Sequence, residues 1–350
     1  MFFIRPATDE DNKELLELEK LCPQGTGLVL QFDRSPDFFC RSRTYDSYNI
    51  YIAQGEGKTI GTIASTVRNF NLNGKRTIGV YIYDLRVHPD HRGRGIGSEL
   101  IQHVIDRSGE VQVAYAIIAE DNYSSLALFK KMGFQKTHDF VLLNIPLYRR
   151  QRSEPHEMRT ITNHDAPQVV KLINEHYRNH DFFSPLTATA FLNKAKKLLG
   201  YGLDKIHVAT VGSRITGCLG LWDCSGVFRA RALRVSTKLK MLSYLLSFIN
   251  VFESTMRLPS VGEPFRVMYA RDFAFTEDIS STEALVEQSL QLAHGYGCTF
   301  LSFPLDSQDP VIAVLTKYKP IRTTYHIHAK SLTSEPLAKP TTIYVDPADL

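Results

Sequence analysis

The chain has 350 residues, 43% of them hydrophobic and 22% charged, which is an ordinary composition for a globular protein and, at about 150 residues per domain, predicts two domains. The formal net charge of +4 permits an anionic ligand but does not by itself indicate nucleic acid, so we expect no nucleic-acid partner. The five scattered cysteines argue against a disulfide framework or a metal site, so we expect free thiols. No apolar run is long enough for a membrane span, and together these features lead us to expect a cytoplasmic protein.

Apolar periodicity predicts alternating strands and helices in the first part of the chain. The expected elements are strand 2–5, helix 9–21, an irregular segment 23–47 with one short helix, strands 49–53, 60–67 and 78–87, helix 95–107, strand 111–119, helix 124–132 and strand 134–145. Asn73-Gly74, between two of these strands, is a strong hairpin signal. This order predicts an α/β fold in the form of a mixed α+β sheet with flanking helices.

The second part of the chain repeats this order. Residues 5–11 correspond to 159–165, with a threonine at the helix N-cap of each, and residues 49–53 correspond to 205–209. The later elements expected there are helix 283–294, strand 298–303, helix 310–318 and strand 322–329. We therefore predict two tandem domains, residues 1–148 and 157–350, joined by the polar, proline-containing linker 149–156.

A glycine-rich turn follows the strand 78–87 and opens the helix 95–107. It consists of Arg92, Gly93, Arg94, Gly95, Ile96, Gly97 and Ser98. Free amides at a helix start carry partial positive charge, and glycine lets the backbone approach a ligand closely, so the arrangement predicts a phosphate site, although glycine spacing alone also fits a plain tight turn. The corresponding segment 276–282 has Glu277 and Asp278 and no glycine, so we expect it not to bind phosphate.

Further motifs accompany this turn. Val87-x-Pro89 precedes it, and Asn122, Phe129 and Gly133-Phe134 follow it. Together they resemble the acetyl-coenzyme A site of the GCN5-related N-acetyltransferases (GNAT). The whole chain also resembles the plant hookless-type N-acetyltransferases and their bacterial relatives, through short matches at 40–43, 85–87, 122–129, 221–224, 258–260, 263–265 and 343–347. This resemblance implies two tandem acyl-CoA N-acyltransferase (GNAT) folds, of which only the first binds the cofactor.

The resemblance also implies an activity, the transfer of an acetyl group from acetyl-CoA to a primary amine by direct attack in a ternary complex. The cofactor-binding residues that it implies are the glycine turn 92–98 for the pyrophosphate and Leu85, Arg86, Val87, Asn122 and Phe129 for the rest of the cofactor. The N–H of Val87 would polarise the thioester carbonyl. Phe129 stands where the family often has a tyrosine that protonates the departing thiolate, and phenylalanine has no proton to donate.

The attacking amine needs a base. An alkyl amine has a pKa of about 10.4, so its proton must be removed before attack. Asp84, one residue before the Leu-x-Val strand end, is the first candidate, and Tyr81 on the same strand is the second. The alternative interpretation of Asp84 is a surface or capping carboxylate.

The acceptor pocket implied by the resemblance is lined by the first helix, the loop after it and the separated strands. This region holds Arg34, Arg41 and Arg43 against Asp33. An excess of arginine favours an amino-acid-like acceptor whose carboxylate is bound in bidentate pairs. Alternatively, these arginines face solvent or pair with nearby aspartates.

Two other segments carry expectations. Residues 229–257 are basic and have apolar residues at helical spacing, which fits either a helix that binds a membrane surface or acidic partner or a helix with one buried and one solvated face. The tail, residues 341–350, contains a short apolar run, so we expect it to pack between the two halves of the chain. Because Phe129 cannot donate a proton, the alternative function is a CoA-binding regulatory or interaction protein with decayed catalysis.

Overall fold

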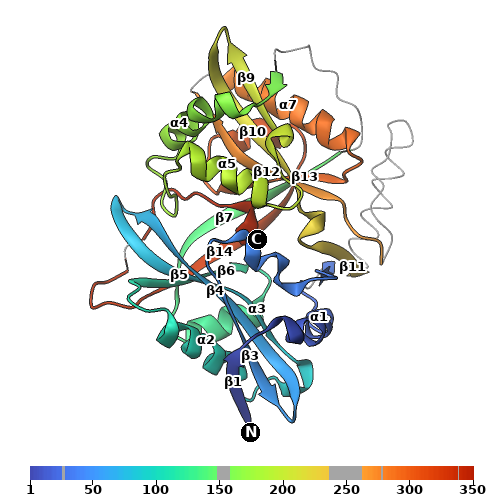
Figure 1. The fold of residues 1–350 in the computed structure, drawn as a ribbon, viewed down its shortest axis with the longest axis vertical. Coiled ribbons are helices and arrows are strands. Elements are labelled where there is room, and N and C mark those ends of the chain that lie inside the picture. Colours follow the sequence, from blue (N-terminus) through green and yellow to red (C-terminus); the bar gives the residue numbers. More distant parts are fainter. Residues whose placement is uncertain (26–27, 148–157, 236–261, 277–278, 338) are drawn as a thin grey trace.

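The structure, a computed structural model, describes residues 1–350 except 26–27, 148–157, 236–261, 277–278 and 338. Two lobes are stacked end to end, one formed mainly by the first half of the chain (residues 1–147) and the other mainly by the second half (residues 158–350) (Figure 1). The linker expected at 149–156 lies outside the described residues, so the division into domains 1–148 and 157–350 stays a prediction.

The first half contains the strands and helices that its periodicity predicts. They are β1 (Phe2–Pro6), α1 (Asn12–Lys20), β2 (Leu28–Asp33), β3 (Asn49–Gly55), β4 (Lys58–Leu72), β5 (Lys75–Val87), α2 (Ile96–Arg107), β6 (Val113–Ala119), α3 (Tyr123–Lys131) and β7 (Gln135–Pro146). One prediction for this half is wrong, because the segment 23–47, expected to be irregular, contains the strand β2 in addition to short 3-10 helices at Phe38–Cys40 and Ser42–Thr44.

The second half follows the same order, with two exceptions. Its elements are β8 (Met158–Thr160), α4 (Ala166–His176), α5 (Ala188–Lys197), β9 (Ile206–Val211), β10 (Arg214–Asp223), β11 (Arg229–Val235), β12 (Val267–Phe275), α7 (Ile279–Gly295), β13 (Phe300–Asp306), α8 (Val311–Thr316) and β14 (Ile321–Ser331), and a 3-10 helix follows at Pro347–Asp349. The helix α5 stands in place of β2, and a strand, β11, is added. The repeat that the sequence predicts is therefore confirmed at the level of the fold.

The first helix of each half is capped in the same way. The Asp11 carboxylate accepts a hydrogen bond of 2.7 Å from the N–H of Thr8 and is bound by Arg5. In the second half Asp165 accepts the N–H of Thr162 at 2.8 Å. Thr8 and Thr162 thus stand at the N-cap positions, as predicted, and the aspartate three residues later accepts the N–H of each threonine.

One 12-stranded sheet runs through both lobes, in the order β1-β3-β4-β5-β6-β14-β7-β13-β12-β10-β9-β8. The last strand of the first half, β7, pairs with β13 of the second half, and Ile145 lies opposite Leu301. The last strand of the second half, β14, pairs with β6 of the first half, and Ile327 lies opposite Ile117. Each half therefore completes its part of the sheet with a strand from the other half.

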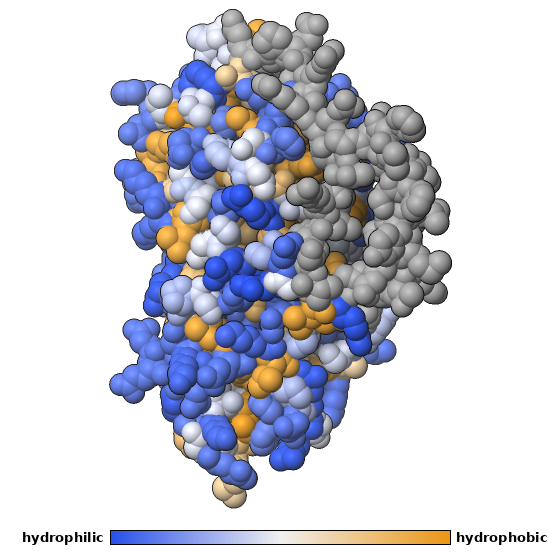
Figure 2. Space-filling model, turned by 90° about the vertical axis from the view of Figure 1, so that its right-hand side faces the viewer, coloured by the Kyte–Doolittle hydropathy of each residue, from blue (hydrophilic) through white to orange (hydrophobic). Residues whose placement is uncertain are grey.

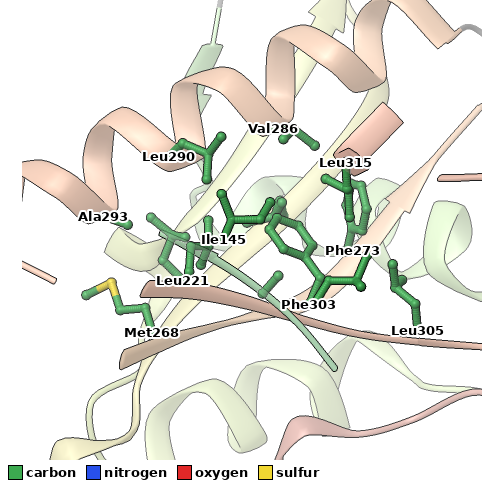
Figure 3. Close-up of a cluster of buried hydrophobic side chains, with 14 of the residues drawn as sticks. Ile145, Leu221, Met268, Phe273, Val286, Leu290, Ala293, Phe303, Leu305 and Leu315 are labelled. Atoms are coloured by element: carbon green, nitrogen blue, oxygen red, sulfur yellow. The ribbon is translucent and has the colours of Figure 1, made fainter. Parts of the chain in front are cut away.

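The exchanged strand β7 brings its side chains into the core of the second lobe. Ile145 is 1% exposed and packs in one cluster with Leu221, Phe273, Leu290 and Phe303 of the second half (Figure 3). Burial of a large aliphatic side chain typically stabilises a fold by about 1.5–3 kcal/mol. The exchange therefore ties the two halves through shared core packing as well as through strand pairing.

The basic segment 229–257 differs from the expected helix in the part that is described. Residues Arg229–Val235 form the strand β11, which pairs antiparallel with β2. Arginine and alanine alternate in its first residues, so Arg229 and Arg231 share a side of the strand, and both lie within 4 Å of Asp33. This period of two explains the strand, and the remainder of the segment lies outside the described residues.

The surface of the described residues shows no large hydrophobic area on the face that Figure 2 presents. On the face shown in Figure 2, hydrophobic residues of the described part form small, separate groups among hydrophilic ones, which is normal for a protein surface. Among the described residues, no helix combines the length and the apolar character that crossing a membrane requires.

Candidate functional site

The glycine turn, residues 92–98, joins the end of β5 to the start of α2 (Figure 1). Gly93 and Gly95 have positive φ angles of 76° and 83°, and Gly95 is the N-cap of α2. A Cβ atom added to either glycine would meet no atom within 4 Å, so the space beside this backbone is open. The turn therefore needs glycine for its conformation and leaves room for a ligand against the main chain.

The helix start presents donors toward that space. The first helical hydrogen bond of α2 runs from Glu99 N to Gly95 O at 3.1 Å, so the amides of residues 96–98 have no acceptor within the helix. Arg92 and Arg94 beside them are exposed. Unpaired amides, the helix dipole and two arginines together make a site that favours a phosphate group.

The neighbouring strands β5 and β6 separate next to this turn. Their parallel pairing covers only Gly79–Tyr81 and Val113–Tyr115, although β5 continues to Val87 and β6 continues to Ala119. A bulge in β5, where Asp84 has a φ of 53°, marks the start of the separation. Leu85, Arg86 and Val87 therefore form a strand edge that β6 leaves unpaired and that leads to the glycine turn, and the Val87 carbonyl there accepts a hydrogen bond of 3.2 Å from Arg92 Nε.

Two more predicted cofactor residues lie on α3. The Asn122 side chain caps this helix by accepting the N–H of Ser125 at 3.3 Å. Phe129 is 3% exposed and packs edge-to-face on Phe134 at 5.0 Å. Gly97 lets the first turn of α2 approach α3, because a Cβ there would lie 2.9 Å from Leu128. The structure thus brings α2, α3 and the end of β5 together on one side of the sheet.

Asp84, the first candidate base, is bound by three arginines. Its carboxylate lies 2.5 Å from Arg34 and 3.0 Å from both Arg41 and Arg86, and Glu19 lies 2.9 Å from Arg86. We call these five residues the arginine cluster. Burial alone would raise the pKa of Asp84, but the three positive charges outweigh it and hold this pKa well below its usual range.

The prediction that Asp84 is a general base therefore conflicts with its surroundings, because such a weakly basic carboxylate has little tendency to take a proton. The alternative of a surface or capping carboxylate is wrong as well, since the side chain is only 4% exposed. The expected recognition of an acceptor carboxylate by Arg34 and Arg41 is also contradicted, because both guanidinium groups bind Asp84. Arg43 instead pairs with Asp37, as the alternative interpretation held.

Tyr81, the second candidate, is buried on the face of the sheet opposite α2 and α3. Its ring stacks on Tyr83 at 5.3 Å and on Tyr115 at 5.1 Å, and its hydroxyl donates to the Asp349 carbonyl at 2.5 Å. Burial raises the pKa of Tyr81 well above its usual value, so the hydroxyl stays neutral. Sequence reasoning missed Arg68, which is 28% exposed on its side chain and pairs with Asp349.

The tail packs between the two halves, as expected. Ile343 and Val345 are 2% and 7% exposed. Asp346 binds Arg271 of β12 at 2.6 Å, and Asp349 binds Arg68 of β4 at 2.9 Å. The apolar run and the two carboxylates were visible in the sequence, but their arginine partners lie far away along the chain.

The second half contains a counterpart of the open strand edge, and it is filled. The strands β12 and β13 pair in parallel only over Val267–Tyr269 and Phe300–Ser302, and the bulge recurs at Asp272, with a φ of 50°. Here, however, the Tyr177 hydroxyl donates to the Phe273 carbonyl at 2.5 Å. Residues of both β12 and β13 line a small cavity with the tail residues Tyr344, Val345 and Pro347. Side chains and the tail thus occupy the place that stays open beside β5.

Comparisons with known proteins agree with this geometry. The model of the Acetyltransferase (GNAT) family matches residues 12–134. "Probable N-acetyltransferase HLS1" of Arabidopsis thaliana is 23% identical over 343 residues, which cover 84% of this chain and 83% of that protein.

Solved structures show the same fold over nearly the whole chain. N-myristoyltransferase of Saccharomyces cerevisiae with bound myristoyl-CoA has a TM-score of 0.66 at 12% identity and covers 96% of this chain and 80% of that one. A tandem GNAT protein from the clavulanic acid biosynthesis pathway has a TM-score of 0.60 at 12% identity and covers 96% of this chain and 100% of that one. The chain therefore has two tandem copies of the GNAT fold, its first half matches the GNAT family over residues 12–134, and nearly its whole length is similar to a hookless-type N-acetyltransferase.

Proposed function

We propose that the chain transfers an acetyl group from acetyl-CoA to a primary amine, and that the cofactor binds the first half only. The observation that carries this proposal is the continuous path from the open edge of β5, through the left-handed Gly93 and Gly95, to the unpaired amides at the start of α2. The chain has a matching edge in the second half, but Tyr177 and the tail fill it.

The residues present fit the parts of the cofactor. The amides of residues 96–98, with Arg92 and Arg94, would hold the pyrophosphate, and the open edge at Leu85, Arg86 and Val87 would pair with the amide groups of the pantetheine arm. Asn122 at the start of α3 would flank that arm. When bound, acetyl-CoA supplies an activated acyl group as a thioester.

The chain's own contribution to the reaction is mainly orientation and a fixed electrostatic environment. A backbone N–H at the end of β5, such as that of Val87, would donate to the acyl carbonyl oxygen, and such a preorganised donor is typically worth about 3–4 kcal/mol of barrier. The arginine cluster holds the bulge at Asp84 that separates β5 from β6. We therefore assign Asp84 a positioning role.

The acceptor amine would approach from the opposite face of the sheet. The glycine turn and α3 lie on the face with Ile96 and Phe129, whereas Tyr81 and the tail lie on the other face. In this arrangement the amine would reach the thioester through the gap between the separated strands. The neutral Tyr81 hydroxyl can hold a hydrogen bond near that meeting point, and the proton of the amine would leave through water.

A second candidate function is a CoA-binding protein whose catalysis has decayed. Two observations favour it: Phe129 has no proton to give to the departing thiolate, and Asp84 is bound as a structural ion pair. Both functions predict cofactor binding, so binding alone does not separate them.

Two measurements test the proposal. Calorimetry with CoA should give one site per chain, and Gly95→Val should abolish binding, because a side chain there strains the left-handed turn and fills the space beside it. Gly109→Val is the matched control, since Gly109 also has a positive φ, 71°, and open space but lies beyond the other end of α2. Release of thiol from acetyl-CoA with tyramine, spermidine and amino-acid esters then separates catalysis from binding. Two equal CoA sites, or no amine-dependent thiol release, would contradict the proposal.

A further inference from the structure

The tail connects the two halves through two carboxylates placed three residues apart. Asp346 accepts hydrogen bonds of 2.6 and 2.9 Å from Arg271, whose side chain is 0% exposed, and 2.7 Å from Lys194. Asp349 accepts bonds of 3.1 and 2.9 Å from Arg68 in the first half. The tail is therefore anchored in the second half and extends into the first.

The tail is anchored where β12 and β13 separate, which is the counterpart of the open edge beside β5. Tyr344 and Val345 line the small cavity beside β12 and β13, together with Arg271. The Tyr344 ring packs edge-to-face on Tyr177 at 4.7 Å, the same tyrosine that satisfies the β12 backbone at Phe273. The second half thus holds the tail at a strand separation that corresponds to the proposed cofactor edge of the first half.

The anchored tail delivers Asp349 to the acceptor face of the first half. The Asp349 Oδ1 accepts a bond of 3.0 Å from the Tyr45 hydroxyl, and its carbonyl accepts the Tyr81 hydroxyl at 2.5 Å. Tyr81 is the last residue of β5 that pairs with β6 before the two strands separate. Asp349 therefore lies where an acceptor approaching the separated strands would pass.

The surroundings of Asp349 suit a cation. The rings of Tyr45, Tyr81 and Tyr115 surround the Arg68 guanidinium at 5.6, 5.2 and 5.8 Å. Tyrosine faces attract cations, and a carboxylate has about four acceptor positions, of which Arg68 and Tyr45 use three. Among the described residues, the hydrogen bonds to the Asp349 carboxylate thus leave one of these acceptor positions, next to an arginine that aromatic rings surround and whose side chain is 28% exposed.

We propose that Asp349, held in place by the second half, is the docking residue for the ammonium group of the acceptor in the first half. This inference rests on the proposed function and gives the second half a role in it: the half without a cofactor supplies part of the acceptor site. The acceptor class that fits is a primary amine that enters as a cation. The acceptor needs no carboxylate, because Arg34 and Arg41, which could have bound one, are bound to Asp84.

The test compares Asp349→Asn with the unsubstituted chain in thiol release from acetyl-CoA, with tyramine and spermidine as acceptor probes. We expect the KM for the amine to rise about tenfold, the effect of losing one charge-assisted hydrogen bond. The KM for acetyl-CoA and the calorimetric affinity for CoA should stay unchanged. Asp349→Glu keeps the charge, so its KM for the amine should lie between those of the unsubstituted chain and Asp349→Asn. If Asp349 had only a structural role, the KM for the amine would not change separately from the KM for acetyl-CoA.

Asp165→Asn is the matched control, because Asp165 also pairs with an arginine, Arg159, but lies away from the tail. If Asp349→Asn fails to fold, Tyr45→Phe removes one hydrogen bond from the same carboxylate and should raise the amine KM in the same direction. An unchanged amine KM in both variants, or a faster reaction without the carboxylate, overturns this inference alone. Absence of turnover by the unsubstituted chain overturns the proposed function and the inference with it.

Discussion

The buried pair of Arg271 and Asp346 makes the stability of the junction between the two halves testable. Asp346→Asn keeps the shape of the side chain but removes the counter-charge of a guanidinium that is 0% exposed. Breaking a buried pair from one side typically costs about 3–5 kcal/mol. Because Asp272 remains 3.8 Å from Arg271, we expect the lower end, about 3 kcal/mol of unfolding free energy.

The assay is urea unfolding at pH 7, with Asp165→Asn as control. The Asp165 carboxylate also binds an arginine through two hydrogen bonds, but Arg159 is 49% exposed, so solvent screens the lost charge and the expected cost is about 1 kcal/mol or less. The reasoning is refuted if Asp346→Asn loses no more free energy of unfolding than Asp165→Asn.

Acid should remove the same contribution. Burial tends to raise the pKa of Asp346, but Arg271 and Lys194 outweigh it and hold this pKa below its usual range. A carboxylate with a depressed pKa in the folded state stabilises the fold above its unfolded pKa of about 3.9, and this stability is lost as the pH falls further. The free-energy difference between the unsubstituted chain and Asp346→Asn should therefore shrink as the pH falls from about 5 to 3.

Two further predictions concern single side chains. Phe129→Tyr should not slow turnover and should raise it by up to about a hundredfold where thiolate protonation limits the rate; a large loss of kcat with unchanged CoA affinity would show that Phe129 is required for packing. Burial lowers the pKa of His176 to about 4, so this histidine stays neutral in the folded chain while the unfolded chain takes up a proton below about pH 6.5. Stability should fall by about 1–2 kcal/mol between pH 7 and pH 5 in urea unfolding, and an equally steep fall in His176→Gln would contradict this assignment.

The features that local sequence could predict are the ones whose physical cause is local. The glycine turn needs left-handed residues at fixed positions, and Gly93 and Gly95 supply them. The threonine caps are also local, because Thr8 and Asp11 are three residues apart. The order of elements and the position of the candidate cofactor site follow from such patterns.

The exchange of β7 and β14 could not be predicted in this way. Each strand has a buried stretch that either lobe could accommodate, so period and composition do not decide which neighbour each one joins. The choice depends on contacts between distant segments, such as Ile145 with Leu301 and Ile327 with Ile117. The strand β2 was missed for the same reason, because its partner, β11, lies in the other half.

The surroundings of Asp84 could not be predicted because its partners lie far away along the chain. A carboxylate beside the strand end suggests a base, and only the structure shows that Arg34 and Arg41 converge on it. For those arginines, the sequence left open substrate binding, exposure to solvent or pairing with nearby aspartates, but it did not indicate Asp84 as their partner. A buried acid and its arginines must be assigned together, since the charge of one sets the availability of the other.

The bulges in β5 and β12 have nearly the same backbone geometry but different surroundings. Asp84 and Asp272 have nearly the same left-handed φ, 53° and 50°, at the point where their strands separate from the next parallel strand. Beside Asp84 the edge stays open and leads to the glycine turn. Beside Asp272 the Tyr201 hydroxyl binds the carboxylate at 2.7 Å, and the tail fills the separation. Because an open strand edge must be satisfied by some partner, the tail covers the separated strands of the second half, and the same tail reaches Tyr45 and Arg68 in the first half.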